Sequence, residues 1–141
     1  MASRSDIITS TRKQLELYSD ITRNLDCNPM TGQLARLINE AELKDTMANL
    51  ILINKYDIPY YPGIGSIIEN LMFEPCDPIT STTLTQLIEQ TLQNNISDRI
   101  TVILVSVVPQ PDQDQYTVTV EFTAKNSTKS IIFSTILSRV R

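Results

Sequence analysis

The stretch that most limits the fold is Tyr116–Ala124, "YTVTVEFTA", in which apolar and polar side chains alternate without a fault. Successive residues of a β-strand point to opposite faces, so this period predicts a strand with one buried and one wet face. Its neighbours, Ile100–Val108 and Ser130–Val140, are rich in β-branched residues and predict two further strands. We expect Ile100–Val108 to be buried on both faces. Short polar links between the three segments predict an antiparallel meander.

The part of the chain before Ile100 has a helical period instead. It predicts one long helix over Gln33–Asn54 and two shorter ones, over Ser66–Phe73 and from Ser81 or Thr82 to about Asn94. The apolar stripe of the long helix is Leu34, Leu37, Ile38, Ala41, Ala48, Ile51 and Leu52, and that of the last helix is Leu84, Leu87, Ile88, Thr91 and Leu92. N-terminal helices packed on a C-terminal three-stranded sheet make an α+β fold.

The length of 141 residues suits one domain, and 41% hydrophobic residues suffice for one core. We expect a flexible segment over residues 1–15, which orders on assembly, and a single domain over residues 16–141. The N-terminal residues are polar, and no apolar run reaches the ~20 residues of a membrane span. These features predict a soluble chain, made in a cytoplasm, with no membrane partner.

Composition argues against several classes of function. The net charge is −4 and the basic residues are scattered, which argues against nucleic acid as a partner. The absence of histidine removes the commonest general base and metal ligand. Cys27 and Cys76 alone cannot complete a zinc site, and we expect both to be reduced thiols. We therefore expect no metal and no cofactor.

Two of the three glycines, Gly63 and Gly65, precede an apolar run in "YYPGIGSIIENLMF". A phosphate cradle would need a third glycine or a following lysine, and neither is present. We expect Pro62, Gly63 and Gly65 to form a structural turn, followed by a helix that Ser66 caps. The residues expected to pack mostly inward are Ile67, Ile68, Leu71, Met72 and Phe73.

Three acidic residues close in sequence, Glu69, Glu74 and Asp77, could in principle supply the carboxylate pair of a glycosidase. Nothing in the sequence separates their environments, as acid and base roles require. The chain is expected not to be an enzyme, with a small muramidase that uses Glu69 or Glu74 as an alternative.

The last predicted strand ends near Arg139 and Arg141, and nothing after it can cover its edge. An exposed edge presents unpaired backbone groups to an arriving strand. We expect a protein to bind there, along Ile132, Ser134, Ile136, Ser138 and Val140, with Ile132, Ile136 and Val140 setting which face is buried.

The order of several short motifs resembles the sheath-initiator family of contractile-phage baseplates. The motifs are "LYSDI", the turn Tyr61–Gly65, "LMFE" at Leu71–Glu74, "DPIT" at Asp77–Thr80, "DRI" at Asp98–Ile100 and a Val-x-Val-x-Pro pattern that leads into "YTVTVEF". Such proteins are wedge subunits with an older "lysozyme-like" label, and they are similar to a small baseplate subunit of type VI secretion systems. The resemblance covers about residues 15–124.

The resemblance implies a structural protein of the virion tail baseplate, assembled in the host cytoplasm in several copies around the tail axis. It implies as partners the other baseplate wedge proteins, the tube and hub proteins, and sheath subunits that add a strand to the sheet. The family's Glu-Pro-Arg contact with the wedge core bundle falls on Ser97, Asp98 and Arg99, of which only Arg99 is kept. Arg99 is the expected contact, with Asp98 either restoring the acid or pairing with Arg99. A generic α+β adaptor is a further alternative.

Overall fold

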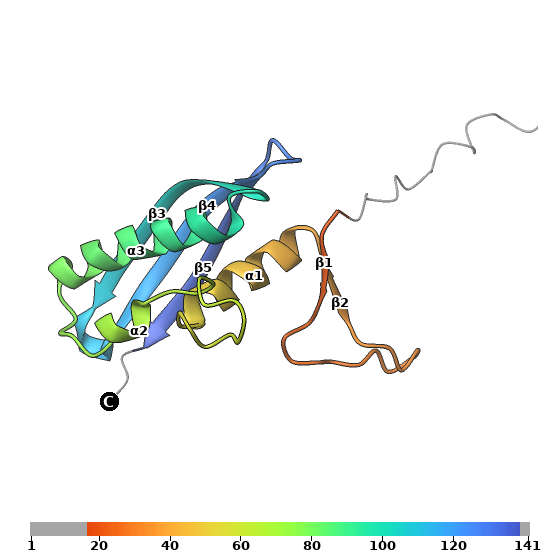
Figure 1. Ribbon diagram of the computed structural model, residues 1–141, viewed down its shortest axis with the longest axis horizontal. Helices are drawn as coiled ribbons and strands as arrows, with labels where there is room; N and C mark the ends of the chain where they lie inside the picture. The colour runs from red at the N-terminus through yellow and green to blue at the C-terminus, as the bar shows by residue number, and fades with distance from the viewer. Residues whose placement is uncertain (1–16, 139–141) are drawn as a thin grey trace, which may run out of the picture. The chain divides into compact units, whose positions relative to one another are not determined.

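The computed structural model describes residues 17–138, so the prediction for residues 1–15 lies outside the described residues. The chain divides into two compact units, Met1–Glu42 and Leu43–Arg141. The first unit holds two short strands, and the second holds two further helices and the sheet (Figure 1). One helix, α1, begins in the first unit and ends in the second.

The first unit is a small β-hairpin of β1 (Ser19–Ile21) and β2 (Arg36–Ile38), paired antiparallel. The prediction of a helix from Gln33 is therefore wrong over its first turns. Arg36–Ile38 pairs with β1 as a strand instead of forming the first turns of a helix. Asn39, which follows β2, has a positive φ of 51°. The side-chain oxygen of Asn39 accepts hydrogen bonds from the backbone nitrogens of Leu17 (3.0 Å) and Tyr18 (3.3 Å), which fixes this turn.

Helix α1 spans Glu40–Leu52, and Ile51 is the one residue of the predicted stripe that is buried in it. Its inward residues in the second unit are Leu43, Met47, Leu50 and Ile51, while Leu52 is 56% exposed. The predicted stripe included Leu34, Leu37 and Ile38, which lie before the helix. The long helix of this fold is the last one, not the first.

Helix α3 (Pro78–Ile96) carries the predicted apolar stripe, with Leu84, Ile88 and Leu92 fully buried. Its predicted start is wrong, because Asp77 is the cap and Pro78 occupies the first turn. The Asp77 Oδ1 accepts a hydrogen bond of 2.8 Å from the backbone nitrogen of Thr80. Proline suits the first turn of a helix, where its missing N–H costs nothing, so this proline starts the helix instead of breaking it.

Helix α2 (Ile68–Leu71) is one turn long, and Ile67 occupies its cap position without a side-chain hydrogen bond. Ser66 instead donates to the backbone oxygen of Ile51 (2.8 Å) and accepts from the backbone nitrogen of Ile68 (3.4 Å). Of the five residues expected to pack mostly inward, only Ile68 and Met72 are buried; Ile67 and Phe73 are 43% and 57% exposed.

The predicted meander is confirmed as a sheet of order β3-β4-β5, with β3 (Ile100–Gln110), β4 (Gln115–Ala124) and β5 (Ser130–Ser138) antiparallel. A short 3-10 turn, η2 (Pro111–Gln113), joins β3 to β4. The alternation of β4 is confirmed, because Tyr116, Val118, Val120 and Phe122 are all fully buried.

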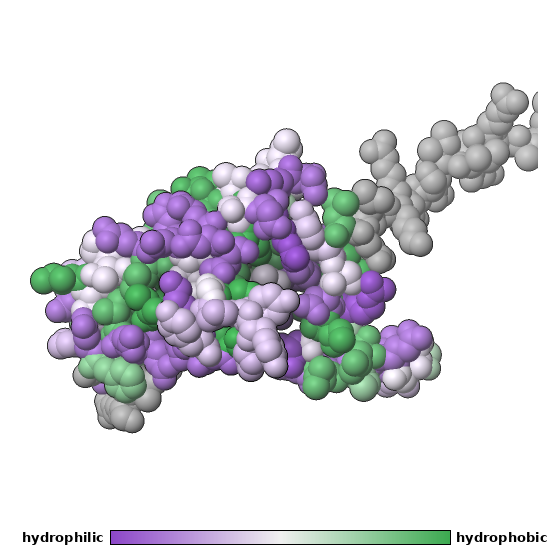
Figure 2. Space-filling model, in the orientation of Figure 1, coloured by the Kyte–Doolittle hydropathy of each residue, from purple (hydrophilic) through white to green (hydrophobic). Residues whose placement is uncertain are grey.

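The prediction that β3 is buried on both faces is wrong. Three of its apolar residues, Ile103, Leu104 and Val108, are 53–59% exposed. Helix α3 packs against β3 from one side, and the described helices bury only that face of the sheet. Figure 2 shows a largely hydrophilic surface over α3, as expected for the solvent side of a helix that buries one stripe.

Tyr116 ties the sheet to the segment before α3. Its ring is fully buried, and its hydroxyl donates to the backbone oxygen of Pro75 at 3.1 Å. Burial, and secondarily the neighbouring thiol of Cys76, raise the pKa of Tyr116 to about 12. Cys76 and the exposed Cys27 are both free thiols.

Candidate functional site

Strand β5 is an edge strand of the sheet in the described part of the chain. It pairs with β4 alone, in an unbroken register from Gln115↔Ser138 to Thr123↔Ser130. Its sequence, "SIIFSTILS", contains no charged residue and no proline. Proteins usually blunt an edge with charges, prolines or bulges, and β5 has none of these over Ser130–Ser138.

The opposite edge, β3, has two of those protections. Its register with β4 shifts between Val102 and Leu104, which is a β-bulge, and Pro109 lies near its end. A bulge twists an edge and leaves a residue unpaired, and a proline cannot donate to an added strand. The two edges of this sheet are thus unequal, and β5 is the edge without these protections over Ser130–Ser138.

Strand β5 turns alternate side chains to opposite faces of the sheet. Ile131, Phe133 and Leu137 are at most 9% exposed and belong to the core. The sequence predicts that Ile132 and Ile136 set which face of this strand is buried. In the structure their side chains are 61% and 58% exposed. The two faces are reversed because the helices cover the side of Leu137.

The outer face of β5 lies in rows with β4 and β3. Ile132 pairs with Glu121, which pairs with Leu104; Ile136 pairs with Thr117, which pairs with Val108. Ser134 and Ser138 are exposed on the same strand. Val140 lies outside the described residues.

Arg99 and Asp98 lie between α3 and β3. The Arg99 Nε is 4.0 Å from the Asp98 Oδ2, with the side chains 44% and 77% exposed. The backbone oxygen of Arg99 accepts from the nitrogen of Lys125 at 3.0 Å, which fixes the residue at the end of the sheet where β5 begins. The structure therefore does not bring this pair to the Ser138 end of β5. An exposed pair at this distance is worth little to stability.

The turn before α2 is constrained at Gly65 and not at Gly63. Gly65 has a φ of +110°, and a β-carbon there would lie 2.6 Å from the backbone oxygen of Ile53. Gly63 has no such φ, and a β-carbon would meet nothing within 4 Å. Two backbone hydrogen bonds, from Ser66 to Ile53 (2.8 Å) and from Lys55 to Ser66 (2.9 Å), hold the segment to the chain that follows α1.

The three acidic residues have distinct structural settings. Glu69 and Glu74 are exposed, and Glu69 accepts a hydrogen bond from the Asn54 side-chain nitrogen. The backbone hydrogen bond from Thr80, with that of its side chain, holds the pKa of Asp77 below its usual value. A general acid needs a raised pKa, so Asp77 serves as a helix cap.

Neither a metal nor a membrane site emerges from residues 17–138. This part of the chain contains no group of three or more acidic or cysteine side chains placed to hold a metal ion. Its helices are also too short or too polar to cross a bilayer.

Comparison with known proteins adds two findings, although no protein-family model matches the sequence. The chain is 28% identical over 106 residues to the baseplate wedge protein gp25 of Enterobacteria phage T4, which covers 75% of this chain and 77% of gp25. A crystal structure from Geobacter sulfurreducens, named a tail lysozyme, superimposes with a TM-score of 0.66 at 13% identity. The superposition covers 76% of this chain and 98% of the Geobacter sulfurreducens chain. At this low sequence identity the match supports the fold alone.

The sequence match spans most of both chains, and the structural match shows that the α+β fold is one that natural proteins use. The sequence match confirms the resemblance predicted from the order of the motifs: this chain is similar to a baseplate wedge protein of a phage tail.

Proposed function

We propose that this chain is a structural baseplate wedge subunit of a contractile phage tail, and that the free edge of β5 accepts a strand from the first ring of sheath subunits. The observation that carries the proposal is the contrast between the two sheet edges. Strand β3 has a bulge and Pro109, while Ser130–Ser138 has a regular register and no charge. The similarity to gp25 supports the virion tail baseplate as its place of action.

Strand addition is a suitable way to start a polymer. Backbone hydrogen bonds supply affinity that does not depend on the partner's exact sequence, and alternate side chains supply the register. Ile132 and Ile136 are exposed on the outer face of β5. Side chains on the same face of an added strand would lie next to them. The first sheath ring would thus begin in one defined register, with Ser134 and Ser138 exposed on the same strand as Ile132 and Ile136.

The hairpin unit supports a role in assembly independently. A two-stranded hairpin is marginally stable alone in water, and a larger apolar contact normally stabilises it. Its exposed apolar residues are Leu17, Ile21, Leu25, Met30, Leu34 and Ile38. We propose that baseplate partners cover this unit, that residues 1–15 order on assembly, and that Arg99, with Asp98, contacts the wedge core bundle.

The proposed role requires no catalysis. Glu69 and Glu74 are exposed on the surface and Asp77 caps a helix, so none of these three acids is buried in an apolar setting of the kind that a general acid for glycoside cleavage needs. We therefore propose that the chain is not an enzyme and that its partners are other wedge proteins, tube and hub proteins, and sheath subunits.

The proposal is tested by placing lysines on each edge in turn. Ile132→Lys with Ile136→Lys adds charge to β5, and Ile103→Lys with Val108→Lys is the matched control on β3, since all four residues are 53–61% exposed. Binding of the sheath subunit from the same tail should fall at least about tenfold for the β5 pair, about 1.4 kcal/mol, and remain near wild type for the β3 pair. Equal losses for both pairs, or none for the β5 pair, would contradict the proposal.

A further inference from the structure

We infer that the pocket at the C-terminal end of β5 receives one large apolar side chain from the strand that adds to this edge. The inference rests on the strand addition proposed above and specifies the chemistry of the partner. The pocket has a volume of about 290 Å³. Its lining residues come from α1, α2 and β5 and the chain between the helices: Ile51, Leu52, Asn54, Ile68, Glu69, Met72, Ile136, Leu137 and Ser138.

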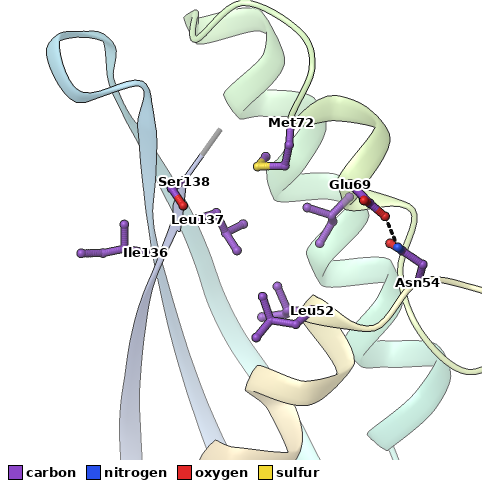
Figure 3. Close-up of a pocket in the computed structure, with 9 residues that line it drawn as sticks. Leu52, Asn54, Glu69, Met72, Ile136, Leu137 and Ser138 are labelled. Atoms are coloured by element: carbon purple, nitrogen blue, oxygen red, sulfur yellow. Dashed lines mark hydrogen bonds between the residues drawn. The ribbon is translucent and has the colours of Figure 1, made fainter. Parts of the chain in front are cut away.

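The interior of the pocket is apolar. Ile51, Ile68 and Met72 are at most 5% exposed and form its inner wall, while Leu52 is 56% exposed at the rim. Three polar side chains lie at its border: Ser138, and Asn54 and Glu69, which are hydrogen-bonded to each other, as Figure 3 shows. Burying an unpaired charge in such a place is costly, so the pocket suits an apolar group.

The register of the sheet determines which residue of an added strand would enter the pocket. Side chains of directly paired residues point to the same face of a sheet. Leu137 is buried on the helix-covered face, and Figure 3 shows it turned toward Met72 and Leu52, with Ile136 pointing the opposite way. The residue that pairs with Leu137 therefore points to the helix side as well.

That partner residue would lie one strand spacing, roughly 4.8 Å, beyond Leu137. Its side chain would point to the same face as Leu137, which lines the pocket together with residues of α1 and α2. Space is sufficient, because a cavity of about 150 Å³ already holds a benzene ring. The partner is therefore an extended, uncharged segment with Leu, Ile, Met or Phe opposite Leu137.

The test fills the pocket from its rim. Leu52→Trp places a larger side chain at an exposed position, and Ile103→Trp is the control, since both residues are nearly equally exposed, at 56%. The probe is the purified sheath subunit of the same tail. Because buried anchor residues carry most binding energy, we expect at least about tenfold weaker binding for Leu52→Trp and less than about twofold change for Ile103→Trp. Leu52→Lys should weaken binding as well, and thermal unfolding checks that each variant is folded.

Amide hydrogen exchange over Ser130–Ser138 separates this inference from the proposal beneath it. If the sheath subunit slows exchange in β5 but Leu52→Trp and Leu52→Lys bind as well as wild type, strand addition stands and the pocket is not its anchor. If the bound sheath subunit leaves β5 exchange unchanged, strand addition itself is wrong. If the free chain dimerises and Leu52→Trp abolishes the dimer, the occupant is a second copy and the inference is overturned.

Discussion

A β-carbon at Gly65 would lie 2.6 Å from the backbone oxygen of Ile53 and 2.9 Å from the carbonyl carbon of Asn54. Backbone atoms cannot move away as the end of a side chain can, and the φ of +110° is itself strained for any L-residue. Gly65→Val should therefore destabilise the fold by about 2–4 kcal/mol, through strain and displaced backbone. Denaturant unfolding measures the loss.

The matched control for this glycine is two residues away. Gly63→Ala adds a β-carbon that meets nothing within 4 Å, at an ordinary φ. Its free energy of unfolding should stay within about 0.5 kcal/mol of wild type. A folded Gly65→Val protein that binds its partners normally would show that the turn is less constrained than its geometry indicates.

Asp77 gives the stability of α3 a dependence on acid pH. Its folded-state pKa lies below the ordinary value of 3.8, because the backbone N–H of Thr80 donates to its ionised carboxylate. The contribution is therefore complete above pH 3.8 and is lost as the pH falls through the lower, folded-state pKa. Asp77→Ala should lower the unfolding temperature at pH 7.

Asp77→Asn separates the charge from the cap. Asparagine is also a good N-cap, so this variant should stay close to wild type at pH 7 and lose less stability in acid. Asp112→Asn, at an exposed position, is the control for removal of a carboxylate. Identical acid profiles for wild type and Asp77→Asn would contradict this account of the cap.

Tyr116 should titrate apart from the other tyrosines. Burial stabilises its neutral form and raises its pKa to about 12, from an ordinary value of 10.0. Its contribution to stability is thus complete below pH 10.0 and is lost as the pH rises through 12. Ultraviolet titration of tyrosinate should show one late step, which Tyr116→Phe removes.

The same substitution removes the hydroxyl that donates to the backbone oxygen of Pro75, which still accepts from the backbone nitrogen of Asp77 at 3.0 Å. Tyr116→Phe should therefore cost about 0.5–1.5 kcal/mol of unfolding free energy, the usual value of one hydrogen bond. Tyr56→Phe, at a residue that is 78% exposed, is the control and should be neutral. A late titration step that survives in Tyr116→Phe would assign it to another tyrosine.

The sequence was sufficient to predict the elements that bury one face only, because their own residues then show a regular alternation of apolar and polar side chains. Strand β4 alternates perfectly because it is central, and α3 carries a complete stripe because one face meets β3. The segment Arg36–Ile38 was mistaken for helix because its partner, Ser19–Ile21, is distant in sequence and imposes the strand. The cap at Asp77 could have been found from the sequence, since Asp-Pro is a typical helix start.

The candidate site was only partly visible in the sequence. The absence of charge in Ser130–Ser138 marks an open edge, but apolar residues occupy both faces of β5, so the pattern could not tell which face the helices cover. The pocket was missed altogether, because Leu52, Met72 and Leu137 are far apart in the chain and only the tertiary fold brings them together.

Muramidase activity separates the structural role from its enzymatic alternative. The purified chain should release no soluble fragments from peptidoglycan, and Glu69→Gln and Glu74→Gln should not differ from wild type. Activity in the wild type that either substitution abolishes would make the chain an enzyme. Sheath binding should be unchanged in Glu74→Gln, because Glu74 is not among the residues that line the pocket beside β5.

The most direct test of the central account is an image of the assembled tail at a resolution that traces the backbone. The account predicts that a strand of a first-ring sheath subunit pairs with Ser130–Ser138 of this chain and extends the β3-β4-β5 sheet by one strand. A tail in which the β5 edge faces solvent, or in which the sheath adds to the bulged β3 edge instead, would contradict it.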